Sequence, residues 1–143
     1  MQASPVFSFR RRVALASLLA AGALALAGCA ALQPVTPESI VTQRVEQRWA
    51  ALIDGNLEKA WEFTQPGFRA IVMQKDYRKR FGSAGQWKNA QVHSVQCESE
   101  RCTVRLRLTS LVLVPPRANR EVAGYVDEVW VRDEGQWWYY QAL

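Results

Sequence analysis

The change in the spacing of apolar residues near residue 87 is the feature that most constrains the fold. In the first half, apolar residues recur with the three-to-four-residue spacing of a helix: Ile40, Val41, Val45, Trp49, Leu52 and Ile53. In the second half, Val104, Leu106 and Leu108 alternate with arginines, which is typical of a strand with one buried side. Helices followed by a run of strands predict an α+β domain, in which helices cover one face of a curved antiparallel sheet.

Start and stop signals divide the first half into short helices. Thr36-Pro37 predicts an N-cap followed by proline at the first helical position, and Gly55 is expected to end this helix. Asn56 is expected to cap a second, short helix that Gln65-Pro66-Gly67 stops. A third helical segment is predicted within residues 68–81.

The second half predicts about four strands, at residues 92–95, 103–108, 122–131 and 137–141. Pro115-Pro116 breaks the run between the second and the third. Asp133-Glu134-Gly135 predicts a three-residue hairpin loop, which would place Arg132 opposite Gln136.

The N-terminus has the three parts of a secretory signal peptide. Three arginines at residues 10–12 precede an apolar run at residues 13–27, and small residues follow it. Those arginines belong to a total of 18 Lys and Arg against 13 Asp and Glu, and removing residues 1–28 lowers the net charge from +5 to +2. Because a nucleic-acid-binding domain is normally strongly basic, no nucleic-acid partner is expected.

Leu26-Ala27-Gly28-Cys29 resembles the lipobox of bacterial lipoproteins. The resemblance implies that residues 1–28 are removed, that Cys29 carries the acyl chains, and that residues 29–36 form a short tether before a domain at residues 37–143. Ala30 stands where inner-membrane lipoproteins tend to have Asp, so the resemblance implies an outer-membrane protein that faces the periplasm. The alternatives are a plain secretory signal with an incidental cysteine and an uncleaved N-terminal helix.

Cys97 and Cys102 flank a polar tetrapeptide between two predicted strands. Residues that face each other across such a hairpin have β-carbons about 4.5 to 5.5 Å apart, near the span of a disulfide. A secreted domain folds in an oxidising compartment, so a structural disulfide between these cysteines is expected. Neither a metal nor another cofactor is expected, because this pair lacks two further ligands and the chain has one histidine.

Residues 48–61 and 65–69 resemble the helix pair that opens the superfamily of nuclear transport factor two and ketosteroid isomerase, and residues 130–138 resemble its closing hairpin. The resemblance covers roughly residues 37–143 and implies a cone-shaped domain with a cavity between sheet and helices. It says little about function, because this fold hosts isomerases, dehydratases, transport factors and envelope domains.

His93 is the first candidate for chemistry in that cavity. If Cys97 faces Cys102, Val95 lies opposite Val104 and His93 opposite Leu106, which puts the histidine on the core side. A histidine there is either a general acid or base or an ordinary hydrogen-bonded core residue.

Asp127 and Glu128 are the second candidates, because adjacent strand residues face opposite sides and either side brings one carboxylate among aromatic residues. The sequence leaves open which of them faces inward. A desolvated carboxylate would have a raised pKa and take a proton from a carbon acid, as the resemblance to ketosteroid isomerase implies. The residues expected to line this cavity are Trp61, Tyr77, Tyr125 and Tyr139.

The sequence therefore predicts a periplasm-facing outer-membrane lipoprotein, attached to the membrane through Cys29. Its expected role is non-catalytic binding of a small apolar ligand or an envelope protein. The first alternative is an isomerase or dehydratase that uses Asp127 or Glu128 with His93 and a tyrosine. The second alternative is a scaffold domain that forms a homodimer.

Overall fold

The computed structural model describes residues 34–81, 86–114 and 118–143. The chain divides into two units, Met1–Pro34 and Val35–Leu143, and the helices and strands below belong to the second. The predicted signal peptide and Cys29 lie outside the described residues. None of the described helices is long and apolar enough to cross a membrane.

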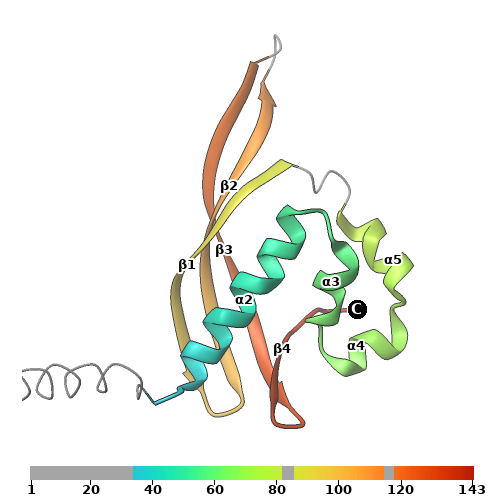
Figure 1. Cartoon of the computed structure of the whole chain (residues 1–143), viewed down its shortest axis with the longest axis vertical. Coiled ribbons are helices and arrows are strands. Elements are labelled where there is room, and N and C mark those ends of the chain that lie inside the picture. The colour runs from blue at the N-terminus through green and yellow to red at the C-terminus, as the bar shows by residue number, and fades with distance from the viewer. Residues whose placement is uncertain (1–33, 82–85, 115–117) are drawn as a thin grey trace, which may run out of the picture. The chain divides into compact units, whose positions relative to one another are not determined.

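Within the described residues, five helical elements precede four strands; Figure 1 shows their arrangement. The helical elements are α2 (Pro37–Ile53), α3 (Leu57–Glu62), α4 (Pro66–Ile71), α5 (Gln74–Arg78) and the 3₁₀ turn η1 (Lys79–Phe81). The strands are β1 (Trp87–Glu98), β2 (Arg101–Val114), β3 (Ala118–Asp133) and β4 (Gln136–Tyr139).

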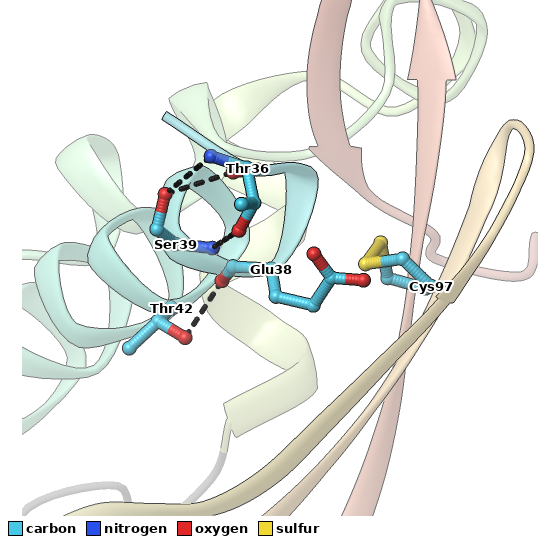
Figure 2. The surroundings of a disulfide bond; sticks show 6 residues. Thr36, Glu38, Ser39, Thr42 and Cys97 are labelled. Carbon is cyan, nitrogen blue, oxygen red and sulfur yellow. Dashed lines mark hydrogen bonds between the residues drawn. A yellow bond between two sulfur atoms is a disulfide. The ribbon is translucent and has the colours of Figure 1, made fainter. Parts of the chain in front are cut away.

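Helix α2 begins and ends where the sequence predicts. The Thr36 hydroxyl accepts a hydrogen bond from the Ser39 backbone N–H, and the Ser39 hydroxyl accepts one from the Thr36 N–H (Figure 2). This reciprocal capping box satisfies N–H groups that the first turn leaves without partners. After the C-cap at Asp54, Gly55 has a φ of 73°, a left-handed conformation that glycine adopts without steric cost.

The helical segments after α3 differ from the prediction. Pro66 begins α4 instead of ending the preceding helix, because the first position of a helix needs no N–H donor. The single segment expected at residues 68–81 is interrupted after Ile71, where Val72 is extended. The Val72 carbonyl accepts a hydrogen bond from Trp61 Nε1 at 3.0 Å, so this carbonyl is satisfied outside a helix.

The four strands form one antiparallel sheet in the order β1-β2-β3-β4, and the predicted fold class is confirmed. Helix α2 lies along one face of this sheet, with α3, α4 and α5 beyond it (Figure 1). Figure 1 also shows that the end of β2 and the beginning of β3 extend past the helices. The side chains buried between helices and sheet include Val41, Val45, Trp49 and Leu52 of α2 and Val104, Leu106 and Trp130 of the sheet.

The predicted register of the last hairpin is wrong by one residue. Asp133 pairs with Gln136, so the loop contains only Glu134 and Gly135, whose φ angles are 49° and 77°. Two positive φ angles are characteristic of the type I′ turn, which matches the right-handed twist of a two-stranded ribbon. Trp130 therefore lies opposite Tyr139.

The predicted disulfide is confirmed. Cys97 and Cys102 are directly opposite each other in β1 and β2, and their sulfur atoms are bonded. Figure 2 shows the Glu38 side chain extending from the first turn of α2 toward Cys97. The hairpin is thus closed covalently beside the start of the main helix.

Candidate functional site

A buried ion pair joins α2 to β3. Arg48 Nη1 donates a hydrogen bond to Glu128 Oε1 at 2.7 Å, and the two side chains are only 3% and 5% exposed. Trp49 Nε1 donates to the same oxygen at 2.9 Å, and Trp130 Nε1 donates to Oε2 at 3.1 Å. Both carboxylate oxygens of Glu128 are therefore engaged by side-chain donors.

The environment of Arg48 keeps it charged. Burial by itself lowers the pKa of the Arg48 guanidinium, but the charge of Glu128, together with Tyr77 and Tyr139, raises this pKa above its ordinary value. The guanidinium also lies 3.7 Å from the centre of the Tyr139 ring, within cation–π range.

Two tyrosines complete the surroundings of the pair. Tyr77 is fully buried, and its hydroxyl has no hydrogen-bond partner of ordinary geometry among the described residues. Burial raises the pKa of the Tyr77 hydroxyl, and the positive charge of Arg48 opposes part of that rise. Burial likewise raises the pKa of Tyr139, again against the charge of Arg48. Both phenols are neutral near pH 7.

Glu128 is the inward carboxylate of the two candidates, and Asp127 faces away. The Asp127 side chain is 59% exposed and lies 4.0 Å from Arg105, on the face of the sheet opposite the helices. The alternation along β3 explains this division, because Glu128 and Trp130 share the inner face while Asp127 shares the outer face with Tyr125.

The predicted core-side placement of His93 is wrong. A β-bulge between Val92 and Ser94 places Val92 opposite Leu106, so His93 has no direct partner in β2 and is exposed. The inserted residue reverses the alternation of side chains at that point. The imidazole instead packs edge-on against Tyr125, with ring centres 5.4 Å apart.

The predicted cavity-lining residues fall in three places. Tyr77 and Tyr139 lie beside the ion pair, whereas Tyr125 is 51% exposed on the outer face. Trp61 links α3 to the chain after α4 through its hydrogen bond to Val72. The structure therefore brings Glu128 together with Tyr77 and Tyr139, and leaves His93, Asp127 and Tyr125 on the other side of the sheet.

Sequence reasoning missed Arg48, the residue that neutralises Glu128. The helical spacing could have identified Arg48 as buried, because it follows Val45 by three residues and precedes Leu52 by four, on the apolar stripe of α2. A cation on a buried helical stripe requires an anionic partner.

The structure has open grooves on its surface, away from the ion pair. One of about 890 Å³ is lined by Arg44, Gln47, Ala50, Ala51, Asp54, Asn56, Lys59, Glu62, Phe63, Gln136 and Trp138. A smaller one of about 300 Å³ is lined by Val35, Pro37, Ile40, Arg44, Arg132, Gly135, Gln136 and Trp137. Arg44 and Gln136 border both grooves, so the two hollows adjoin.

No protein-family model and no curated protein matches this sequence. Among solved structures, a SEC-C motif containing protein from Psychrobacter arcticus is similar, with a TM-score of 0.54, 12% identity and coverage of 76% of this chain and 63% of that one. A protein from Thiobacillus denitrificans, described as a calcium/calmodulin-dependent protein kinase type II association domain, has a TM-score of 0.52, 16% identity and coverage of 75% and 93%. A protein from Streptomyces avermitilis described as an NTF2-like dehydratase has a TM-score of 0.49, 12% identity and coverage of 73% and 95%. The helices and four-stranded antiparallel sheet of residues 35–143 thus share their fold with the solved domains from Psychrobacter arcticus and Thiobacillus denitrificans.

Proposed function

We propose that this chain is a lipid-anchored protein of the bacterial envelope, whose domain binds another envelope protein and does not catalyse proton transfer. The observation that carries the proposal is the state of Glu128. Its carboxylate accepts hydrogen bonds from Arg48, Trp49 and Trp130, and only 6% of the residue is exposed.

A proton-transferring isomerase or dehydratase needs a carboxylate within hydrogen-bond reach of its substrate. Glu128 is surrounded by its own donors, and the exposed Asp127 and His93 lie on the other side of the sheet from Tyr77. This arrangement favours a structural role for Glu128, which joins α2 to the sheet.

Binding of a protein partner is favoured over binding of a small apolar ligand. The space beside the ion pair is occupied by aromatic side chains, with Trp49, Tyr77 and Trp130 all buried. The larger groove is instead on the surface and has both polar and aromatic walls, such as Gln47 and Trp138. The cores of protein–protein contacts are enriched in aromatic residues and arginine, and Arg44, Phe63 and Trp138 line this groove.

The proposed anchor rests on the resemblance of residues 26–29 to a lipobox. Two or three acyl chains on Cys29 would hold the chain stably at the membrane. Helix α2 begins at Pro37, and the seven residues from Ala30 to Thr36 reach at most ~25 Å when fully extended. The domain would therefore meet its partner close to the periplasmic face of the outer membrane.

Cross-linking in intact cells tests this proposal. The full chain and the variant Cys29→Ala are expressed in the presence of labelled palmitate, treated with an amine-reactive cross-linker that enters the periplasm, and separated by membrane fractionation. We expect the full chain to be labelled, to sediment with outer membranes and to cross-link to another envelope protein. The variant should lose label and be released.

Three results would contradict parts of the proposal. Label that persists in Cys29→Ala would refute the anchor. Cross-links between copies of this chain alone would favour the dimerising scaffold. A product formed from a carbon-acid substrate, and lost in Glu128→Gln without loss of folding, would restore the enzyme hypothesis.

A further inference from the structure

Arg44 is a half-buried cation that forms no ion pair with any residue the structure describes. Its guanidinium carbon lies 5.3 Å from the centre of the Phe63 ring and 5.0 Å from that of Trp138. Its Nε is buried and has no hydrogen-bond partner in the described part of the chain. No described carboxylate comes within 4.0 Å of the guanidinium.

A second guanidinium adds to this positive charge. Arg69 lies 4.5 Å from the centre of the same Trp138 ring and donates hydrogen bonds to the backbone carbonyls of Glu62 and Thr64. Burial, and then the charge of Arg69, lower the pKa of the Arg44 guanidinium. Two arginines thus share one indole with no carboxylate paired to either among residues 34–81, 86–114 and 118–143. An anion that pairs with Arg44 would offset this cost.

The groove beside Arg44 continues along α2. Its apolar wall includes Ala50, Ala51 and Phe63, and its amide side chains are Gln47, Asn56 and Gln136. Lys59 and Glu62 also line the groove, but they neutralise each other through a contact of 2.7 Å. The remaining charge is Asp54 at the C-terminal end of α2, which forms no ion pair with a described residue.

Arg44 and Asp54 therefore place opposite charges at two ends of one stripe. They are ten residues apart in α2, which corresponds to about 15 Å along a helix. An extended peptide covers this distance with four to five residues, at about 3.3 Å each. The amide side chain of Gln47 lies between the two ends on α2 and is suited to hydrogen bonds with a peptide backbone.

We propose that this groove binds an extended segment of the partner protein that carries both an acidic and a basic side chain, with the carboxylate of the segment paired to Arg44. A basic side chain four to five residues away in the segment contacts Asp54. This inference deepens the proposed binding role, because it names the surface and the chemistry of the segment that occupies it. A peptide fits better than a small acid, because the groove is open and its two charges are far apart.

A titration of the full chain, purified in neutral detergent, tests the inference. The probe is the peptide Gly-Glu-Ala-Gly-Ala-Gly-Lys-Gly with blocked ends, compared with its reversed sequence and with a version in which Gln replaces Glu. NMR signals of Arg44 Nε–H and Trp138 Nε1–H report binding up to millimolar concentrations. We expect saturable shifts with one of the Glu peptides, and a Kd about tenfold to a hundredfold weaker with the Gln peptide.

Two charge-matched variants locate the site. Arg44→Gln should weaken binding of the Glu peptide about tenfold or more. Arg107→Gln removes the same charge from an exposed position of β2 outside the groove, and should leave the Kd unchanged. Far-ultraviolet circular dichroism of both variants controls for folding, and the Gln peptide tests the same pairing without changing the protein.

The remaining outcomes would overturn the inference. Absence of saturable binding, equal affinity for Glu and Gln peptides, or equal loss in both variants would each refute a carboxylate site at Arg44. Sodium acetate that binds as tightly as the peptide would show that a small carboxylate suffices, and would refute the peptide assignment. The peptide titration is independent of the cross-linking experiment in cells. If the groove does not bind the peptide, the lipid anchor and the existence of a protein partner are still tested by cross-linking.

Discussion

Arg48 and Glu128 are 80 residues apart in the sequence and 2.7 Å apart in the fold, and both are buried. One belongs to the helix layer and the other to the third strand, so their contact fixes the position of α2 on the sheet. The indoles of Trp49 and Trp130 supply the other donors to the carboxylate. Both oxygens of the buried carboxylate therefore accept hydrogen bonds from side chains of the domain itself.

Removing one partner of this pair should be strongly destabilising. Glu128→Leu leaves the Arg48 guanidinium buried without a counter-charge, and we expect a loss of about 3–5 kcal/mol in the free energy of unfolding. The double variant Arg48→Met with Glu128→Leu should lose much less unfolding free energy than the two single variants lose in sum, because no uncompensated charge remains. Urea denaturation of the four proteins measures this coupling. Additive losses would argue that the two residues do not interact.

Tyr77→Phe should have little effect on the stability of the domain. The Tyr77 hydroxyl is buried beside the Arg48 guanidinium but has no hydrogen bond of ordinary geometry to a described residue, whereas the ring packs edge-on against Phe68 and Phe81. Phenylalanine keeps the ring and removes a hydroxyl that lacks a well-formed hydrogen bond, so we expect a change within about 1 kcal/mol in the free energy of unfolding. Thermal unfolding near pH 7 tests this expectation, and a loss above 1 kcal/mol would indicate that the hydroxyl has a partner.

Alkaline pH should destabilise the domain through its buried phenols. Because the pKa values of Tyr77 and Tyr139 are raised in the folded state, the unfolded chain releases these protons first. The contribution to stability is complete below pH about 10 and decreases as the pH rises above that value toward the folded pKa.

Unfolding free energies measured between pH 8 and 11.5 test this pH dependence. The free energy of unfolding of Tyr77→Phe should decrease less steeply above pH about 10 than that of the unmodified chain. Tyr140→Phe, at an exposed position, is the control and should follow the unmodified chain. Identical curves for all three proteins would contradict the role of Tyr77 in the alkaline transition.

Removal of the disulfide should cause a moderate loss in the free energy of unfolding. Replacing Cys97 and Cys102 by alanine opens only a short loop, for which the chain-entropy relation gives a stabilisation of about 2 kcal/mol. Urea denaturation of the double variant should show this loss with the same cooperativity. Thiol titration of the unfolded protein without reductant should find neither cysteine free, and two titratable thiols from these positions would contradict the disulfide.

Local patterns predicted the elements well because their causes lie within a few residues. The Thr36-Ser39 capping box, the glycine after α2 and the alternation of Val104 and Leu106 are all short-range features. The disulfide was also within reach, because a two-residue turn separates the two strands that carry it.

The sequence-based predictions were wrong where a single residue changes which side chains of a strand point toward the core. The bulge at His93 and the two-residue loop at Glu134-Gly135 each shift the register, and each therefore exchanges the inner and outer faces. No nearby residue specifies the bulge at His93.

The sequence by itself determined the order of helices and strands, the fold class and the cysteine pair, since periodicity and turn chemistry act over short distances. Only the tertiary structure decided that Glu128 is the buried carboxylate, that Arg48 neutralises it, and that Arg44 lies near the rings of Phe63 and Trp138 beside an open groove. These relations join segments 19 to 94 residues apart. They exist because burial of a charge is tolerated only where the folded chain places compensating groups around it.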